Sequence, residues 1–403
     1  MQEEEASILI DALIEGGLIS VLVDRLRYLN ESIKEEASAV YNALSVLENC
    51  IDVKPDVAQI IAETPGVLEW LCARLSPKTE VDSNKQYSSE VLAVILQSAG
   101  TQARLKFVEM DGVDRALQSV APYRSQGIRS PEEEEFVENV FDILCAVLME
   151  DIAKVSFVEN EGIELMILVL KGRTPSRTAA LKCLDFATTG YCDSCQRAIT
   201  EGLLPSLFGI FMGKIKLKKG TSNQGKKKES INRDEEEVRC VSIISNLLAW
   251  LKDDALKVRV IAKFVEGEFE KCDRLMEIFS RFAFKVAEEE RHIAHLHDME
   301  EGDQEEMLLA RMDAGLFTLQ QCALIIGELW YTGEYGLKNR LLLLLHQQGY
   351  TLGYLRALLE EYLNALGPAE EESKLNNAGR TEIERVQGIL SSLLAPNHVK
   401  EES

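Results

Sequence analysis

The side chains in this chain that are best suited to chemistry are two cysteines and three histidines, each set closely spaced. Cys192 and Cys195 form a CxxC pair, which can hold a metal or exchange a disulfide. No second pair follows at zinc-finger spacing, and no strand pattern places the pair in a thioredoxin-like unit. His292, His295 and His297 crowd an acidic stretch but lack the HExxH arrangement of metalloproteases. We therefore expect a pH-responsive surface segment there. The alternative is a metal-dependent enzyme that uses this histidine cluster.

Motifs for nucleophilic catalysis and for phosphate binding are absent from the sequence. It contains no GxSxG elbow, no P-loop and no GxGxxG cradle. Five histidines, three of them in one expected loop, supply little material for general acid and base catalysis. The sequence therefore predicts a protein that is not an enzyme, with no catalytic residue, no metal site and no cofactor.

Acidic residues outnumber basic ones by 67 to 44, which gives the 403-residue chain a formal net charge of −23. Nucleic acids require a basic surface, so we expect no direct contact with DNA or RNA. A basic peptide is the complementary partner. The alternative is that the acids only keep a long chain soluble.

Composition also limits the compartment. No run of about eighteen uncharged apolar residues occurs, which predicts no membrane-spanning helix. The first residues, Met1–Glu5, are acidic, so we expect no signal peptide. Nine cysteines at irregular spacing do not form a disulfide framework, and five of them lie in apolar helical patterns. These features favour a reducing compartment, the cytosol or the nucleus.

The elements that must position any site follow a recurring pattern, in which a glycine closes a polar stretch and opens a short apolar helix. Between Gly17 and Gly202 the intervals are 49, 46, 50 and 40 residues. A helical period in the forties is typical of stacked repeats that share one elongated core. The pattern predicts an all-α, armadillo/HEAT-type right-handed superhelical solenoid with terminal capping helices. The recurring glycines are Gly17, Gly66, Gly112, Gly162, Gly202, Gly267, Gly315 and Gly349.

Interruptions of this rhythm divide the chain into segments. One of them carries seven lysines without an acid, and it is either a nuclear-localisation signal or a solvated loop. These lysines are Lys214, Lys216, Lys218, Lys219, Lys226, Lys227 and Lys228. We expect N-terminal capping helices over 1–33, armadillo repeats over 34–213, a lysine-rich loop insertion over 214–233, an armadillo repeat over 234–284, an acidic and His-rich irregular segment over 285–306, an armadillo-like repeat over 307–366, a loop over 367–380 and a C-terminal capping helix over 381–396.

The inner surface of such a solenoid is the expected binding site, because the long third helix of each armadillo unit lines it. Asn246 and Trp250 lie four residues apart, so they share a helix face. An asparagine can hold a peptide backbone, and an indole can receive a cation. The alternative for Trp250 is a place in the core. Residues expected to face inward and bind peptide are Asn42, Glu138, Asp142, Asn246, Trp250 and Glu328, with Lys182 beside them.

Six stretches go beyond general periodicity: Leu29–Ala37, Ser89–Gln97, Glu138–Cys145, Ala180–Asp185, Lys271–Glu277 and Met312–Phe317. Together they resemble the beta-catenin-like protein 1 family, nuclear armadillo proteins associated with the spliceosome. The resemblance runs from about Ile8 to Leu394 in the same order, and the family also carries a lysine-rich insertion near Lys214.

The resemblance implies a non-catalytic adaptor of the NineTeen (Prp19–Cdc5-type) complex in pre-mRNA splicing. Its implied partners are proteins of that complex, including the Cdc5-type Myb-domain splicing factor. Family members bind basic segments of the nuclear-localisation type, and in vertebrates also the antibody-diversifying cytidine deaminase. The implied location is the nucleus.

Two departures from related patterns refine this expectation. The chain begins inside the repeat region, without the family's basic N-terminal extension, so we expect a trimmed chain or a shorter orthologue. The Trp-x-x-x-Asn ladder of nuclear import receptors is also missing, because the residue four positions after Asn42 is Val46 and the residue four positions after Lys182 is Phe186. Carboxylates rather than stacked indoles should then hold a basic peptide, and a nuclear transport receptor remains the alternative. Because the ends of an open solenoid are apolar, a homo-oligomer is a further expectation.

Overall fold

The computed structural model describes residues 3–215, 226–296, 303–332, 334–366 and 375–394. Throughout these ranges the secondary structure is helical, with twenty-two α-helices, one 3-10 helix and no strand. The prediction of an all-α fold is therefore confirmed. The chain forms two compact units: unit 1 comprises Met1–Ala187, Thr200–Ser206 and Lys216–Glu229, and unit 2 comprises Thr188–Ile199, Leu207–Ile215 and Ser230–Ser403.

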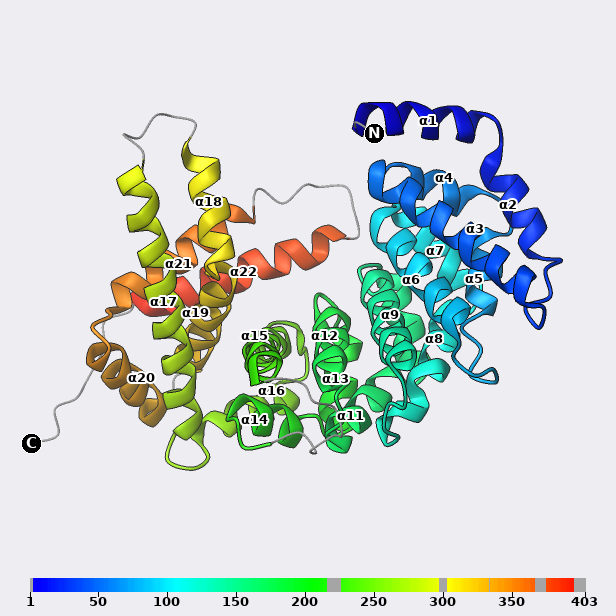
Figure 1. Ribbon diagram of the computed structural model, residues 1–403. Coiled ribbons are helices and arrows are strands. Elements are labelled where there is room, and N and C mark those ends of the chain that lie inside the picture. The colour runs from blue at the N-terminus through cyan, green and yellow to red at the C-terminus, as the bar shows by residue number, and fades with distance from the viewer. Residues whose placement is uncertain (1–2, 216–225, 297–302, 333, 367–374, 395–403) are drawn as a thin grey trace, which may run out of the picture. The chain divides into compact units, whose positions relative to one another are not determined.

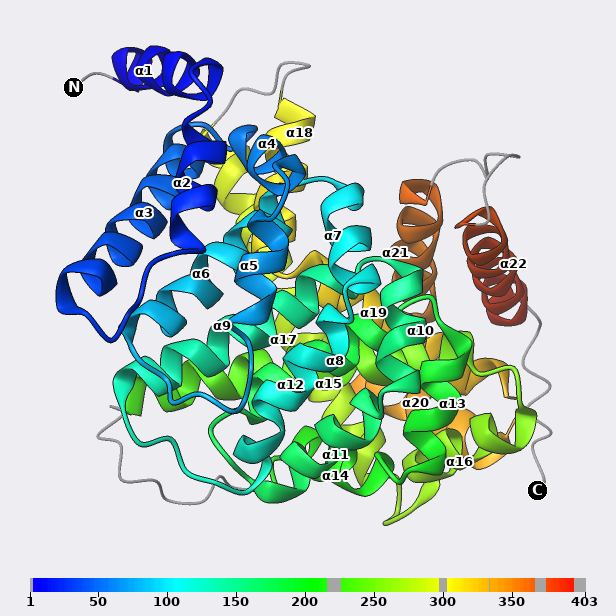
Figure 2. The same cartoon turned by 90° about the vertical axis from the view of Figure 1, so that its right-hand side faces the viewer.

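Unit 1 is built from groups of two short helices followed by a long one. Its helices are α1 (Glu3–Glu15), α2 (Leu18–Leu26), α3 (Lys34–Val53), α4 (Val57–Glu63), α5 (Val67–Ala73), α6 (Ser83–Ser98), α7 (Thr101–Glu109), α8 (Gly112–Val120), η1 (Ala121–Arg124), α9 (Pro131–Val147), α10 (Asp151–Glu159), α11 (Gly162–Gly172) and most of α12 (Arg177–Thr188). The long helices α3, α6 and α9 lie side by side, with α6 in contact with both neighbours (Figure 1, Figure 2). The buried aliphatic side chains of each group pack against the next group, as expected for stacked repeats.

In unit 1 the recurring glycines mark the junction between the first and second helix of each group, for two different physical reasons. Gly66 has a φ of 89°, a left-handed conformation that only glycine adopts without strain. At Gly112 the left-handed residue is instead the preceding Asp111, with a φ of 55°. Here the constraint is space, because a Cβ on Gly112 would lie 2.5 Å from the ring of Phe107. Gly162 repeats this arrangement against the ring of Phe157, 2.7 Å away.

Unit 2 continues the rhythm with longer helices. It contains most of α13 (Cys192–Thr200) and α14 (Leu204–Phe211), together with α15 (Lys226–Trp250) from Ser230 onward, α16 (Asp254–Val265), α17 (Glu270–Leu296), α18 (Asp303–Asp313), α19 (Leu316–Tyr331), α20 (Tyr335–Gln347), α21 (Leu352–Ala365) and α22 (Leu375–Leu394). The long helix α19 packs against α17, α21 and α22. Helix α18 falls between α17 and α19 and contacts both, so it is an addition to the three-helix group α16, α17 and α19.

Three predicted boundaries are wrong, each because a polar stretch was interpreted as irregular. Helix α15 begins at Lys226 rather than at Asp234, within the predicted lysine-rich loop. The predicted irregular segment 285–306 is instead occupied up to Leu296 by α17 and from Asp303 by α18. Helix α22 begins at Leu375, within the predicted loop. Lys, Glu, Gln and Ala are strong helix formers, so a high polar content does not by itself interrupt a helix.

Among the described residues, no single helix has both the length and the apolar composition to cross a membrane. The pair Glu5–Glu15 and Leu18–Leu26 meets the criterion only when taken together, and it is bent by 65°. Ile10, Ile19 and Val23 of this pair are buried within the fold.

Candidate peptide-binding surface

The long helices of unit 1 are tied together by hydrogen bonds from side-chain amides to the neighbouring long helix. Asn84 of α6 donates to the carbonyl oxygen of Ala37 on α3, at 3.0 Å. Asn139 of α9 donates to Ser89 Oγ on α6, at 3.2 Å. Because these bonds supplement the apolar packing, α3, α6 and α9 form a fixed support for the side chains that they expose.

Four carboxylates gather on this support, and we call them the acidic face: Glu48 and Asp52 on α3, Glu90 on α6 and Glu135 on α9. Asp52 and Glu135 are exposed, while Glu48 and Glu90 are half-buried. Burial raises the pKa of Glu90 above its usual value, and the charges of Glu48, Glu135 and Asp52 raise it further. A hydrogen bond from Gln86 to Glu90, at 3.0 Å, acts in the opposite direction.

The acidic face is not neutralised by the cations around it. Within the described ranges, no lysine or arginine forms an ion pair with any of its four carboxylates. The carboxylates therefore repel one another across three helices, and a cationic ligand would relieve that repulsion.

Two tyrosines border the acidic face. The rings of Tyr41 on α3 and Tyr87 on α6 lie with their centroids 4.8 Å apart and their planes tilted by 50°. Tyr87 is buried and donates its hydroxyl to Glu48, and burial together with this bond raises the pKa of Tyr87 to about 12. Tyr41 is 47% exposed, so its ring offers a face to a cation beside the carboxylates.

The three predicted residues of unit 1 lie on the expected helices. Asn42 on α3 and Glu138 on α9 are exposed. Asp142 is half-buried and accepts a hydrogen bond from Lys182 of α12, at 2.7 Å. This ion pair offsets the charge of Asp142, so Asp142 contributes less to a negative surface than the unpaired carboxylates do.

Two of the three predicted residues of unit 2 are not available to a peptide. Asn246 is buried and donates to Thr188 Oγ1, at 3.3 Å, and to Thr189 Oγ1, at 3.0 Å. Trp250, the last residue of α15, is only partly exposed. The second residue that a peptide cannot reach is Glu328, which is buried in the packing of α19.

Glu328 is 2% exposed and lies between two cations. One carboxylate oxygen is 3.0 Å from the Arg385 guanidinium, and the other is 3.1 Å from Lys257 Nζ. Arg385 also contacts Glu382 on its own helix. Glu328 therefore joins α19 to α22 and α16, a structural role, and we remove it from the candidate binding residues.

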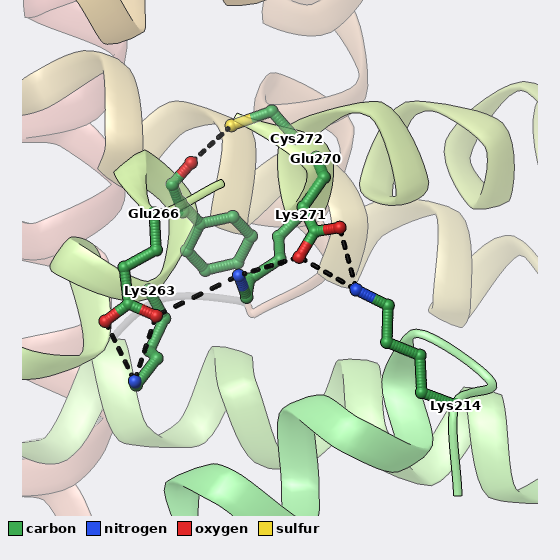
Figure 3. A network of polar contacts seen from close by, with 7 residues as sticks. Lys214, Lys263, Glu266, Glu270, Lys271 and Cys272 are labelled. Atoms are coloured by element: carbon green, nitrogen blue, oxygen red, sulfur yellow. Dashed lines mark hydrogen bonds and ion pairs between the residues drawn. The ribbon is translucent and has the colours of Figure 1, made fainter. Parts of the chain in front are cut away.

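The described part of the lysine-rich segment takes part in an alternating chain of charges (Figure 3). Lys214 Nζ lies 2.8 Å from Glu270, whose carboxylate also lies 3.4 Å from Lys271. The hydrogen bond from Lys214 holds the pKa of Glu270 below its usual value, although desolvation acts against it. Glu266 continues the chain, 4.0 Å from Lys271 and 2.9 Å from Lys263. Because the signs alternate, this surface is close to neutral.

Other candidate residues fall partly outside the described structure. Lys216, Lys218 and Lys219 lie outside the described residues, and Lys226, Lys227 and Lys228 begin α15 with undescribed side chains. Their role as a localisation signal stays a prediction.

His292 is exposed on α17, whereas the side chain of His295 and all of His297 lie outside the description. Cys195 is buried, and its thiol donates to the carbonyl oxygen of Thr188, at 3.3 Å. No group of metal-binding side chains occurs within the described ranges.

Comparison with known proteins gives this surface its family context. Residues 1–360 match the family described as "Catenin-beta-like, Arm-motif containing nuclear". The chain belongs to this family. The beta-catenin-like protein 1 of Homo sapiens is 34% identical over 401 residues, which cover 97% of this chain and 68% of that protein. The homolog of Schizosaccharomyces pombe is 32% identical over 337 residues, which cover 82% of this chain and 56% of that protein.

A solved structure confirms the armadillo prediction for the fold of this catenin-beta-like chain. It was described under the heading "A conserved phosphorylation switch controls the interaction between cadherin and beta-catenin in vitro and in vivo". It matches with a TM-score of 0.54 at 13% identity, over 95% of this chain and 62% of that chain. At this identity the likeness concerns the fold alone.

Within this catenin-beta-like chain, sequence reasoning did not find the four residues of the acidic face. The prediction chose inward residues on the long helices by alignment of their Ala-Leu core pairs, and it chose none on α6. On α3 that choice gave Asn42, one position away from the stripe Tyr41, Ser45, Glu48 and Asp52. These residues recur at three- and four-residue spacing, so they share an edge of the helix. A search for a second stripe at helical spacing, beside the apolar one, could have found them.

Proposed function

We propose that this protein is a non-catalytic nuclear adaptor that holds a lysine- and arginine-rich segment of a splicing factor on its acidic face. The observation that carries the proposal is the set of four carboxylates on α3, α6 and α9, whose mutual repulsion contributes to the raised pKa of Glu90. The nuclear description of its family supports the proposed location.

Charge and ring chemistry account for how the peptide is held. An extended basic segment that crosses the three helices meets Asp52, Glu90 and Glu135 in turn. A lysine or arginine beside them can also lie over the exposed ring of Tyr41. Exposed ion pairs contribute about 0.2–1 kcal/mol each, so several must form together to give useful affinity. Binding of this kind weakens as salt is added.

The proposed partners are proteins of the NineTeen (Prp19–Cdc5-type) complex, including the Cdc5-type Myb-domain splicing factor. The resemblance to spliceosome-associated armadillo proteins supports this choice. An adaptor needs only affinity and geometry, so the proposal assigns no catalytic residue and no cofactor to this chain.

A charge-matched pair of double variants tests the acidic face. A fluorescent peptide with the basic segment of the Cdc5-type factor is titrated with the wild type, with Glu90→Gln/Glu135→Gln and with Glu109→Gln/Glu159→Gln. The control pair removes two exposed carboxylates from α7 and α10 in the same unit. We expect the first variant to bind about tenfold more weakly at low salt, and the control to bind like the wild type within a factor of about two. Equal losses in both variants would show that only net charge matters, which contradicts the proposal.

The splicing assignment has a separate test. Tagged wild type and Glu90→Gln/Glu135→Gln are used to capture proteins from a nuclear extract of the same organism. The proposal expects the wild type to recover NineTeen components and the variant to recover less of them. Recovery of basic proteins without any splicing component would leave the acidic face intact as a peptide site but would refute the splicing role.

A further inference from the structure

Helix α18 has an unusual place in unit 2, because it is an addition to a three-helix group that is complete without it. Its inner side is fixed by Arg311, which lies 2.7 Å from Glu290 of α17 and makes a bidentate contact with Glu361 of α21, at 2.5 and 2.9 Å. Bidentate arginine–carboxylate pairs fix geometry as well as adding energy. Helix α18 is therefore held at a defined place and orientation.

The outer side of α18 is apolar and exposed. Leu308, Leu309 and Met312 are 49%, 62% and 44% exposed, and their spacing places them on one side of the helix. We call these three residues the α18 patch.

Two contacts set the register of α17 against α18 and against the turn that follows it. Glu290 of α17 meets Arg311 near the end of α18, and the Phe282 ring lies 2.5 Å from where a Cβ of Gly315 would stand. The two helices therefore run antiparallel. Figure 1 shows α17 and α18 side by side in this orientation. Large exposed apolar patches mark interaction sites more often than isolated exposed residues do.

The charges around the α18 patch indicate what covers it. On α18 the exposed charges are Glu305, Glu306 and Asp313, and none of them forms an ion pair among the described residues. The margin of the patch is therefore negative along α18.

We propose that the α18 patch binds an amphipathic helix of another protein, whose apolar face is bordered by lysine or arginine on the edge that meets α18. Such a helix would lie against the exposed side of α18 and would exclude water from Leu308, Leu309 and Met312. A second copy of this chain would bring the same negative margin against itself, which disfavours self-association here. The proposal uses residues of unit 2 only, so it does not depend on the acidic face.

Three synthetic helical peptides of equal length test the proposal. They share one apolar face and carry lysine, glutamine or glutamate along its margins. Each is titrated by fluorescence anisotropy with the full chain bearing Glu90→Gln/Glu135→Gln, so that the acidic face contributes little. We expect the lysine-edged peptide to bind at least about tenfold more tightly than the glutamate-edged one.

Variants locate that binding. Leu309→Ser/Met312→Ser should lower the affinity for the lysine-edged peptide by about tenfold or more, as loss of a central apolar contact does. Leu343→Ser on α20 removes another exposed leucine, 48% exposed, and should leave binding unchanged. Glu305→Gln/Asp313→Asn should keep the apolar contact but reduce the preference for lysine over glutamate. Circular dichroism checks that each variant folds.

Three outcomes would overturn the proposal. The first is equal affinity for the three peptides. The second is lysine-edged binding that is unaffected by Leu309→Ser/Met312→Ser. The third is a wild-type dimer in sedimentation that the same variant dissociates, because a second copy would then be the occupant.

Discussion

Substitution of Glu90 should raise stability and lower affinity at the same time. In the wild type, Glu90 is half-buried among Glu48, Asp52 and Glu135, and burial followed by these charges raises its pKa above the usual 4.5. A carboxyl whose pKa is higher in the folded than in the unfolded protein favours the protonated folded state. Its stabilising contribution is complete below the unfolded pKa and is lost as the pH rises through the folded pKa. At neutral pH the ionised Glu90 therefore destabilises the fold.

The expected gain from Glu90→Gln is modest. Glutamine keeps the size of the side chain and can still accept a hydrogen bond from Gln86, so the packing of α6 should not change. The change removes one negative charge from a partly solvated cluster, where water screens each interaction. We therefore expect the free energy of unfolding at pH 7 to rise by about 0.5 kcal/mol. The same loss of charge should weaken a basic peptide by about two- to fivefold.

Urea unfolding followed by circular dichroism at pH 7 and pH 4, with Glu159→Gln as the control, measures the first effect. The advantage of Glu90→Gln should be present at pH 7 and should shrink at pH 4, where the wild-type carboxyl becomes protonated. Because a repeat protein can unfold in stages, the midpoint of the transition that reports on unit 1 is the quantity to compare. A variant that is less stable than the wild type at pH 7, or one whose gain is the same at both pH values, would refute the reasoning. If Glu90→Gln binds the basic peptide as tightly as the wild type does, the charge of Glu90 does not contribute to peptide binding.

Three further substitutions test structural claims by urea unfolding. Glu328→Gln should destabilise the protein by about 3 kcal/mol, because it leaves Arg385 without one of its buried carboxylate partners, and a change below about 0.5 kcal/mol would contradict the structural role. Gly112→Ala should destabilise by about 1–3 kcal/mol, because its Cβ would meet the ring of Phe107, and an unchanged transition would show that the junction is loosely packed. Asp111→Gly should stabilise by about 1 kcal/mol, because glycine adopts the left-handed conformation without strain, and a loss of stability would mean that the Asp111 side chain has a role of its own.

The repeat architecture could be predicted from the sequence because its signal is local. A glycine at each helix junction is required either by a left-handed backbone conformation, as at Gly66, or by a close aromatic ring, as at Gly112. Both constraints act between residues a few positions apart, so they leave a periodic trace in the sequence. The polar segments misled the prediction because Lys, Glu and Ala continue a helix as readily as they fill a loop. Helices α15, α17 and α22 all extend further into such segments than expected.

The binding surface was harder to predict because it depends on contacts across the chain. Glu328 has the local sequence context of an inward acid, yet Lys257 and Arg385, far away in the sequence, bury it in an ion-pair network. The side-chain amide of Asn246 likewise donates hydrogen bonds to the hydroxyl oxygens of Thr188 and Thr189. No helical spacing distinguishes an acid that is paired from one that is unpaired, because the partner is chosen by tertiary packing.

The acidic face and the buried Glu328 network show how charge is divided in a chain with a net charge of −23. Buried carboxylates must have cationic partners, since an unpaired buried charge destabilises a fold strongly. Exposed carboxylates can remain unpaired, because water screens their repulsion to a few tenths of a kcal/mol per pair. Clustering them on α3, α6 and α9 costs little stability, and it concentrates negative potential where a cationic ligand would relieve it. On this reasoning, the unpaired exposed acids, rather than the paired and buried ones, are the first residues to test for peptide binding.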